Sequence, residues 1–157
     1  KRIVFIPSEA EKTGGYGKTN SYEAKMAAKL AMKVYERYRK DFDTTKTLGI
    51  ITPYRSQIAL IKKEISYYNV PLLNEIAVDT VERFQGSERD VIIYSFSVNY
   101  IYQLKFLVNT MEEAGVLIDR KLNVALTRAR KQLFLMGVPE ILQTDSIYRN
   151  LLKMIKD

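Results

Sequence analysis

The fold is decided by the stretch Leu122-Asn123-Val124-Ala125-Leu126-Thr127-Arg128-Ala129-Arg130, which continues as Lys131-Gln132-Leu133-Phe134-Leu135-Met136-Gly137. Four apolar residues of the first part recur at the i, i+3, i+4, i+7 spacing of one buried helical face: Leu122, Ala125, Leu126 and Ala129. At about 100° per residue, Arg128 and Arg130 lie about 110° and about 90° to either side of that face. The stretch therefore predicts a packed helix with a guanidinium group at each edge, followed by a buried strand.

The two arginines have two interpretations. Arginine presents planar donors that stay charged, so a helix that holds Arg128 and Arg130 beside a central strand is suited to binding a phosphate. Cations near the C-terminal end of a helix also complement the helix dipole without any ligand. The stretch by itself leaves both interpretations open.

The composition excludes several classes of chemistry. The chain has 157 residues, of which 46% are hydrophobic and 27% charged, as expected for one folded domain with a substantial core. It contains neither cysteine nor histidine, which rules out disulfides, thiolate metal sites, His-based triads and imidazole ligands. Ligation of magnesium by carboxylate oxygens is the metal chemistry that remains.

The charge points to a polyanionic partner. The formal net charge is +7 and the pI is near 9.5, which favours nucleic acid or a nucleotide as the ligand. No stretch reaches the roughly 18 apolar residues of a membrane span, and no signal peptide is present. The chain begins at Lys1 and passes directly into a strand-like run. We therefore expect an intracellular fragment, cytoplasmic or nuclear, of a longer protein that makes no membrane contact.

The rest of the chain alternates strand-like and helix-like segments. Expected strands span residues 2–7, 48–52, 76–80, 91–96 and 131–137, and expected helices span residues 21–40, 55–67, 122–130 and 147–155. In between, residues 100–108 fit a strand or a short helix, and residues 109–115 fit a turn-rich excursion. The alternation predicts an α/β sandwich with a mainly parallel sheet. Such sheets bind ligands beyond the carboxyl ends of their strands. The loops that follow strands are residues 8–20, 52–57, 81–90 and 97 onward.

The first of these loops ends in Gly17-Lys18-Thr19, which resembles the end of a P-loop. A P-loop needs a glycine five positions before Gly17, where this chain has Lys12. We therefore expect a basic loop here and not a phosphate cradle.

The second loop, Thr52-Pro53-Tyr54-Arg55-Ser56-Gln57, ends a strand and opens a helix. It gathers a hydroxyl, an aromatic ring, a guanidinium and an amide at a helix N-terminus, where a phosphate binds favourably. A base could stack on Tyr54 without regard to its identity. The alternative is that Pro53 and Ser56 only start the helix while Tyr54 packs.

The third loop belongs to Val78-Asp79-Thr80-Val81-Glu82-Arg83-Phe84-Gln85-Gly86-Ser87-Glu88-Arg89-Asp90-Val91-Ile92-Ile93, the most specific segment of the chain. Gly86 allows backbone to approach a ligand closely. The neighbouring carboxylate of Glu88 is suited to a sugar hydroxyl or to a partner's arginine. The alternative is an ordinary polar loop in which Gly86 is the turn residue.

Four segments together resemble the motifs of superfamily 1 helicases. Residues 78–93 resemble motif V, residues 122–130 resemble motif VI, and residues 52–57 resemble the motif that precedes them. Asn20-Ser21-Tyr22-Glu23-Ala24 resembles the signature at the head of the first helix of the second motor domain. The order and spacing are similar to those of the branch that contains the nonsense-mediated-decay and Okazaki-processing helicases. The chain departs from the family between residues 99 and 118, where an aromatic-rich stretch replaces the polar, glycine-containing link.

The resemblance implies that residues 1–157 form one RecA-like domain, a three-layer sandwich and the second of two such domains. ATP would lie in the cleft between the two domains. By the match to motif VI, Arg128 would be the arginine finger that stabilises charge on the transferring γ-phosphoryl group. By the match to motif V, the nucleotide would be faced by Gln85, Gly86 and Glu88. Arg130 is assigned to this nucleotide region through interdomain or motif V contacts.

The resemblance also implies the partners. Single-stranded DNA or RNA would cross the top of both domains and contact Thr52, Tyr54, Arg55 and Thr80. The phosphate-binding lysine and the ligands of Mg²⁺ would belong to the N-terminal RecA-like domain, before Lys1. The isolated chain should therefore hydrolyse no ATP, although the longer protein would be an ATP-dependent helicase. The competing hypothesis is a non-catalytic nucleic-acid-binding or scaffolding module with a degenerate RecA-like fold.

Overall fold

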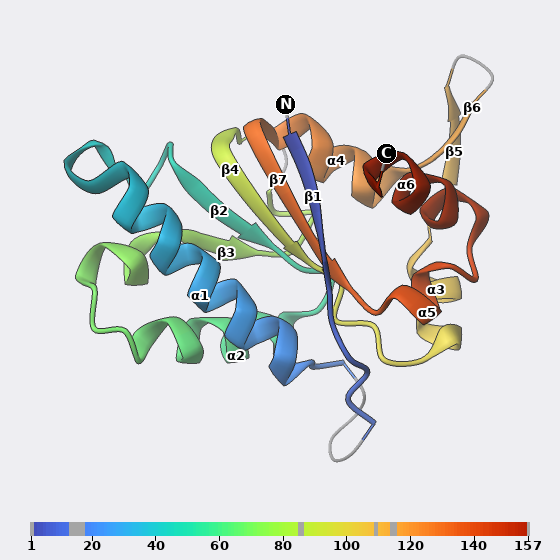
Figure 1. Cartoon of the computed structure of the whole chain (residues 1–157), viewed down its shortest axis with the longest axis horizontal. Helices are drawn as coiled ribbons and strands as arrows, with labels where there is room; N and C mark the ends of the chain where they lie inside the picture. Colours follow the sequence, from blue (N-terminus) through green and yellow to red (C-terminus); the bar gives the residue numbers. More distant parts are fainter. Residues whose placement is uncertain (1, 13–17, 85–86, 109, 114–115, 157) are drawn as a thin grey trace.

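The structure, a computed structural model, describes residues 2–12, 18–84, 87–108, 110–113 and 116–156 (Figure 1). Its strands are β1 (Arg2–Pro7), β2 (Leu48–Ile51), β3 (Ala77–Asp79), β4 (Arg89–Ser95), β5 (Thr110–Glu113), β6 (Val116–Asp119) and β7 (Ala129–Gly137). Its α-helices are α1 (Ser21–Tyr38), α2 (Arg55–Ser66), α3 (Ile101–Leu107), α4 (Arg120–Arg128), α5 (Pro139–Leu142) and α6 (Ser146–Lys156). Two short 3₁₀ helices are η1 (Arg39–Asp41) and η2 (Pro71–Glu75).

The central sheet has five strands in the order β1-β7-β4-β2-β3, and every pairing in it is parallel. Helices α1 and α2 cover one face, and α4 and α6 pack on the other (Figure 1). The predicted three-layer α/β sandwich with a parallel sheet is therefore confirmed. The antiparallel pair β5-β6 stands apart from this sheet and projects from the body of the domain (Figure 1).

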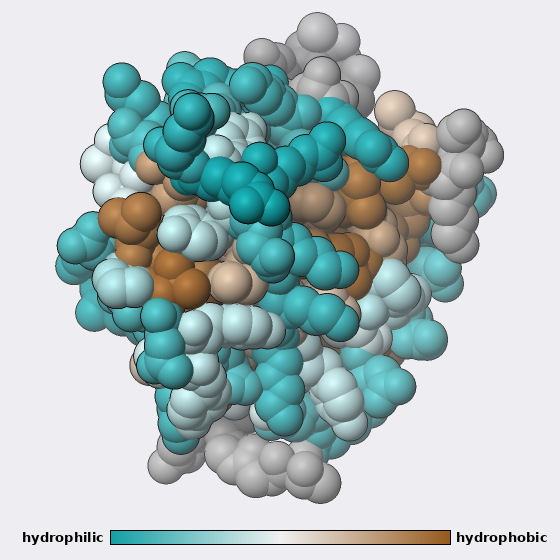
Figure 2. Space-filling view, turned by 60° about the vertical axis from the view of Figure 1, so that its left-hand side comes forward, coloured by the Kyte–Doolittle hydropathy of each residue, from teal (hydrophilic) through white to brown (hydrophobic). Residues whose placement is uncertain are grey.

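The helix α1 lies close to the sheet because its buried face is built of small side chains. Its N-cap is Asn20, whose Oδ1 accepts a hydrogen bond from the backbone N–H of Glu23 (2.9 Å). The buried stripe then contains Ala24, Ala27, Ala28 and Ala31, each at most 1% exposed. The outer side of this layer carries polar residues. The face shown in Figure 2, turned so that the side of α1 and α2 comes forward, is accordingly mostly hydrophilic.

Two expected elements differ from the structure. The helix predicted for residues 122–130 ends at Arg128, and Ala129 and Arg130 belong to β7. Ala129 faces Arg89 in the parallel pairing of β7 with β4, so strand pairing overrides the continuing helical pattern. A turn-rich excursion was expected for residues 109–115, but residues 110–113 form β5, which pairs antiparallel with β6. The short-helix alternative for residues 100–108 is confirmed by α3.

Within the described parts of the chain, none of the helices combines the length and the apolar character that crossing a membrane requires.

Candidate functional site

The candidate site residues divide between the two opposite edges of the sheet. We call the edge where the strands begin the amino edge and the edge where they end the carboxyl edge. Arg89 and Ala129 are paired at the starts of β4 and β7, so the residues immediately before them, Glu88 and Arg128, both lie at the amino edge. At the carboxyl edge, Thr52 follows β2 and donates its backbone N–H to the carbonyl of Asp79, the last residue of β3 (3.1 Å).

This division corrects one expectation. The loop after β3 was expected to place its functional residues beyond the carboxyl ends of the strands, and for Glu88 that is wrong. Parallel strands can be joined only by a crossover that returns to the starting edge of the sheet. The loop therefore leaves β3 at Thr80 on the carboxyl edge and reaches β4 at Glu88 on the amino edge. The predicted Gln85 and Gly86 lie within this loop but outside the described residues.

Arg128 is held by the packing of the helix that it ends. The N-cap of α4 is Asp119, whose Oδ1 accepts the backbone N–H of Lys121 (3.0 Å) and whose Oδ2 accepts the hydroxyl of Tyr148 in α6. At the other end of α4, Nη1 of Arg128 donates to Oγ1 of Thr127 (3.3 Å). Its Nε is buried and has no hydrogen-bond partner among the described protein groups. A buried, unpaired donor on a cation is a position where an anionic acceptor would be favourable.

Arg89 contacts Phe84, Ser87 and Glu88 in the segment that precedes β4. Its guanidinium lies over the ring of Phe84, 5.2 Å from the centroid, and Nη1 donates to the carbonyl of Glu88 (3.0 Å) and to the hydroxyl of Ser87. The side chain is 9% exposed, and its Nε, like that of Arg128, has no partner among the described groups. Burial, followed by the charge of Arg130, lowers the pKa of Arg89 from its ordinary value.

Gly49 in β2 makes room for this arrangement. A Cβ on Gly49 would overlap Cζ of Phe84 and come within 3.2 Å of Cγ of Arg89. Phe84 and Arg89 thus rest directly on the β2 backbone. The contribution of Arg89 was missed at the level of sequence, although its place next to Glu88 was visible there. The missing information was the contact with Gly49, which only the tertiary structure supplies.

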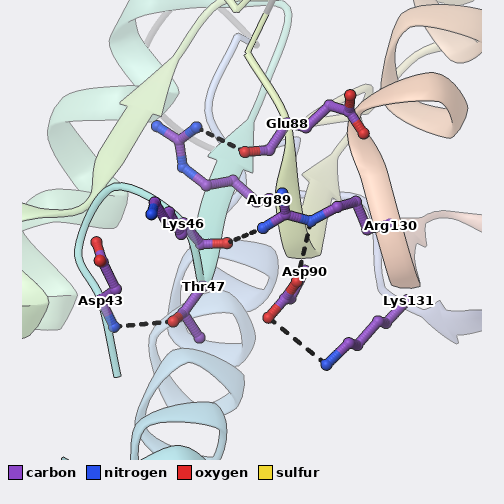
Figure 3. A network of polar contacts seen from close by, with 8 residues as sticks. All are labelled: Asp43, Lys46, Thr47, Glu88, Arg89, Asp90, Arg130 and Lys131. Carbon is purple, nitrogen blue, oxygen red and sulfur yellow. Dashed lines mark hydrogen bonds and ion pairs between the residues drawn. The ribbon is translucent and has the colours of Figure 1, made fainter. Parts of the chain in front are cut away.

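Arg130 joins three segments at the amino edge (Figure 3). Its Nε lies 3.0 Å from Oδ1 of Asp90, and its Nη2 donates to the backbone carbonyl of Lys46 (3.1 Å). Asp90 also donates its N–H to that carbonyl (2.9 Å) and lies 3.8 Å from Nζ of Lys131. Arg130 therefore braces β7 against β4 and the turn before β2. It lies beside the loop of Glu88, but two of its donors are already engaged within the protein.

At the carboxyl edge, the predicted residues differ in accessibility. Arg55 is exposed, Tyr54 is half-buried with Nζ of Lys18 5.8 Å from its ring centroid, and Thr80 is 9% exposed. Thr52 is fully buried, and its Oγ1 has no hydrogen-bond partner in the described structure. In this conformation a ligand can reach Arg55, Tyr54 and the exposed part of Thr80. It cannot reach the buried hydroxyl of Thr52.

A buried carboxyl group lies beneath this edge. Glu23 is 0% exposed; its Oε1 accepts hydrogen bonds from the hydroxyl of Ser95 (2.7 Å) and the N–H of Ser97 (2.9 Å), and its Oε2 accepts the hydroxyl of Ser8 (2.7 Å). Burial raises the pKa of Glu23 to about 7, and the three hydrogen bonds partly oppose that rise. Glu23 therefore connects α1 to the ends of β1 and β4.

Buried amides extend this network to α2. Gln57 accepts the N–H of Asn20 and donates to the carbonyl of Asn20, each at 2.9 Å. The Asn20 side chain in turn donates to Oδ1 of Asn99 (2.9 Å), which lies just before α3. The residues that resembled a family signature, Asn20 and Glu23, are thus the centre of a polar cluster that ties the loops of the carboxyl edge together. The sequence showed the signature but not its partners.

The described residues contain no group of three or more acidic side chains arranged to hold a metal ion. The expectation that Mg²⁺ ligands belong to another domain stays a prediction.

A solved structure has the same architecture. The C-terminal domain of a possible DNA helicase from Lactobacillus plantarum matches with a TM-score of 0.50, covering 94% of this chain and 81% of that one at 13% identity. At this identity the likeness concerns the fold. The parallel sheet and its helical layers are those of a RecA-like domain.

Sequence comparison gives the family. The profile of the AAA domain family matches residues 1–140, and this chain belongs to that family. It is 32% identical to Helicase SEN1 of Saccharomyces cerevisiae over 141 residues, which are 88% of this chain and 6% of that protein. It is 32% identical to the Regulator of nonsense transcripts 1 homolog of Drosophila melanogaster over 159 positions, covering 99% of this chain and 12% of that protein.

A third relative is the DNA polymerase alpha-associated DNA helicase A of Saccharomyces cerevisiae, 40% identical over 97 residues, 62% of this chain and 13% of the relative. The chain thus spans only a small part of the length of these relatives. The predicted membership in the superfamily 1 helicases is confirmed.

Proposed function

We propose that this chain is the second motor domain of an ATP-dependent helicase or translocase that acts on single-stranded DNA or RNA. It would form one wall of an ATP site with a preceding RecA-like domain and carry part of the surface that holds the strand. The observation that carries this proposal is that Glu88 and Arg128 directly precede the paired starts of β4 and β7 at the amino edge, where the Nε of Arg128 is buried and has no hydrogen-bond partner among the described groups.

Arg128 would act as the arginine finger. A guanidinium remains charged at any physiological pH and can engage two phosphate oxygens at once. Phosphoryl transfer depends mainly on positioning and on stabilising charge in the transition state, and an arginine finger contributes about 10³- to 10⁵-fold to the rate. The buried Nε of Arg128 fits this role because an anionic oxygen would supply its missing acceptor.

The loop of motif V would hold the other side of the nucleotide. We assign the exposed carboxylate of Glu88 to a ribose hydroxyl or a partner arginine, and Gln85 and Gly86 to the close approach of backbone. Arg89 would keep this loop closed through Phe84 and Ser87. Arg130 would hold the amino edge together through Asp90 and the carbonyl of Lys46, which already engage two of its donors. Mg²⁺, if held by the preceding domain, would neutralise phosphate charge.

The single-stranded nucleic acid would lie across the carboxyl edge of the sheet. Arg55 is the first residue of α2 and is exposed, so its guanidinium and the helix N-terminus both favour a phosphate there. Tyr54 offers a ring to a base, and Thr80 lies at the start of the same loop that ends at Glu88. One loop would therefore touch the strand at one end and the nucleotide at the other. Contact with Thr52 would require this edge to open.

The test is ATP hydrolysis by the protein that carries this chain together with the preceding RecA-like domain, with and without single-stranded nucleic acid. We expect hydrolysis that the strand stimulates, and none from the 157-residue chain alone. Strand binding without any stimulated hydrolysis would instead support a non-catalytic binding module.

A further inference from the structure

The aromatic stretch that follows β4 is built onto the carboxyl edge. The rings of Tyr100 and Tyr102 are stacked, with centroids 5.5 Å apart and an interplanar angle of 24°. Tyr102 lies in the first turn of α3 and is 55% exposed. Tyr54 is joined to this stretch through Lys18, whose Nζ lies 5.8 Å from the Tyr54 ring centroid and whose carbonyl accepts the hydroxyl of Ser97 (2.9 Å). We call Tyr54, Tyr100 and Tyr102 the tyrosine platform.

Cations accompany the platform. Nζ of Lys12 lies 5.4 Å from the ring centroid of Tyr100, and Nζ of Lys18 lies 5.8 Å from that of Tyr54. Arg55 adjoins Tyr54 in the chain and is exposed. Rings flanked by cations match a ligand that alternates planar bases with phosphates. They match an apolar protein helix poorly, since such a helix needs a groove free of charge.

The platform is fixed to the fold. The backbone N–H groups of Asn99 and Tyr100 both donate to Oε1 of Gln103, at 2.8 and 3.0 Å. The Asn99 side chain donates to the carbonyl of Thr19 (2.8 Å), and the hydroxyl of Tyr100 donates to the carbonyl of Lys12 (3.3 Å). The rings are thus positioned by the same buried network that holds α1 and α2. A preorganised ring loses less conformational freedom when it binds.

We propose that the tyrosine platform binds the bases of the single strand by stacking, and so extends the nucleic-acid surface from α2 onto α3. Tyr102, the most exposed of the three rings, would carry the largest share, while Lys12 and Lys18 pair with the flanking phosphates. This inference rests on the proposed function in one respect, namely that the strand crosses the carboxyl edge. Stacking on tyrosine tolerates every base, so the site would add affinity without strong sequence preference.

The experiment measures the affinity of fluorescein-labelled oligo(dT) and oligo(rU) for the two-domain protein by fluorescence anisotropy. We expect Tyr102→Leu to weaken binding about 5- to 100-fold and Tyr102→Phe, which keeps the ring, to change it less than about threefold. Tyr67→Leu is the matched control, because Tyr67 is 61% exposed at the far end of α2 from Tyr54. Thermal unfolding of each variant checks the fold.

An oligonucleotide with abasic sites separates stacking from other effects. Without bases, the wild-type protein and Tyr102→Leu should bind equally. The proposal is overturned if Tyr102→Leu binds the normal strand as wild type does, or if it loses equal affinity for the abasic strand. If Arg55→Ala still weakens binding in the first case, the proposed function stands without the platform. If no carboxyl-edge variant changes binding, the strand does not cross this edge and both proposals fail.

Discussion

Nζ of Lys121 in α4 lies 2.8 Å from Oε1 of Glu82, so the helix that ends at Arg128 is joined to the loop that begins at Thr80. The hydrogen bond from Lys121 is the main cause of the lowered pKa of Glu82. The loop that we assign to nucleic-acid binding and the helix that we assign to the nucleotide site are therefore in direct contact. A change in the loop at the carboxyl edge has a short physical route to the arginine at the amino edge.

We expect Glu82→Gln to reduce the stimulation of ATP hydrolysis by the strand about 2- to 30-fold, the usual range for a residue that links two sites. Because the Glu82 side chain is 62% exposed, the unfolding free energy should change by less than about 1 kcal/mol. Steady-state hydrolysis with and without oligonucleotide measures the first effect. The double variant Glu82→Lys/Lys121→Glu, which swaps the two charges, should restore the stimulation. If Glu82→Gln leaves the stimulation unchanged, the contact between Glu82 and Lys121 does not couple the two sites.

Gly49→Ala tests the packing of Phe84 and Arg89 under the nucleotide loop. The added Cβ overlaps Phe84, so we expect a loss of about 1–3 kcal/mol of stability in urea unfolding, together with a raised KM for ATP. Gly137→Ala is the matched control. Its Cβ would meet the side chain of Leu142 instead, far from the amino edge, so it should destabilise the fold without raising KM. An equal KM for both variants would argue against a role of this packing in nucleotide binding.

The buried Glu23 predicts a pH dependence of stability. Its pKa is raised from 4.5 in the unfolded chain to about 7 in the fold, so the folded state binds more protons between these values. The associated stability is fully present below pH 4.5 and is lost as the pH rises through 7. At about 1.4 kcal/mol per pKa unit, this group accounts for about 3 kcal/mol.

Glu23→Gln provides the measurement, because the amide has the shape of the protonated acid and does not titrate. The difference in unfolding free energy between the wild type and Glu23→Gln should shift by about 3 kcal/mol in favour of the variant between pH 4 and pH 8. A difference that stays constant over this range would mean that folding leaves the pKa of Glu23 at its ordinary value.

Local patterns were sufficient to predict most of the fold. The alanine face of α1 and its Asn20 cap are contained in one short segment, and each predicted strand is an apolar run between turn residues. The end of α4 was misplaced because Ala129 continues the helical spacing that begins at Leu122 and is itself a strong helix former. Its state is decided by pairing with Arg89, which lies 40 positions earlier in the chain.

The candidate site was less predictable for the same reason. The motifs named Arg128 and Glu88, but their common place at the amino edge follows from the register of β4 and β7. The partners of Glu23, Ser95 and Ser97, are separated from it by more than 70 residues. The brace formed by Arg130 depends on a carbonyl in the turn before β2. Contacts across the sheet leave no periodic pattern in the sequence.

The central claim is that Arg128 acts directly on the transferring phosphoryl group. The most direct measurement is strand-stimulated ATP hydrolysis by the two-domain protein, comparing the wild type with Arg128→Ala and with Arg130→Ala. We expect Arg128→Ala to lower kcat about 10³-fold or more while ATP still binds, and Arg130→Ala to have a much smaller effect. Hydrolysis at the wild-type rate by Arg128→Ala would contradict the account.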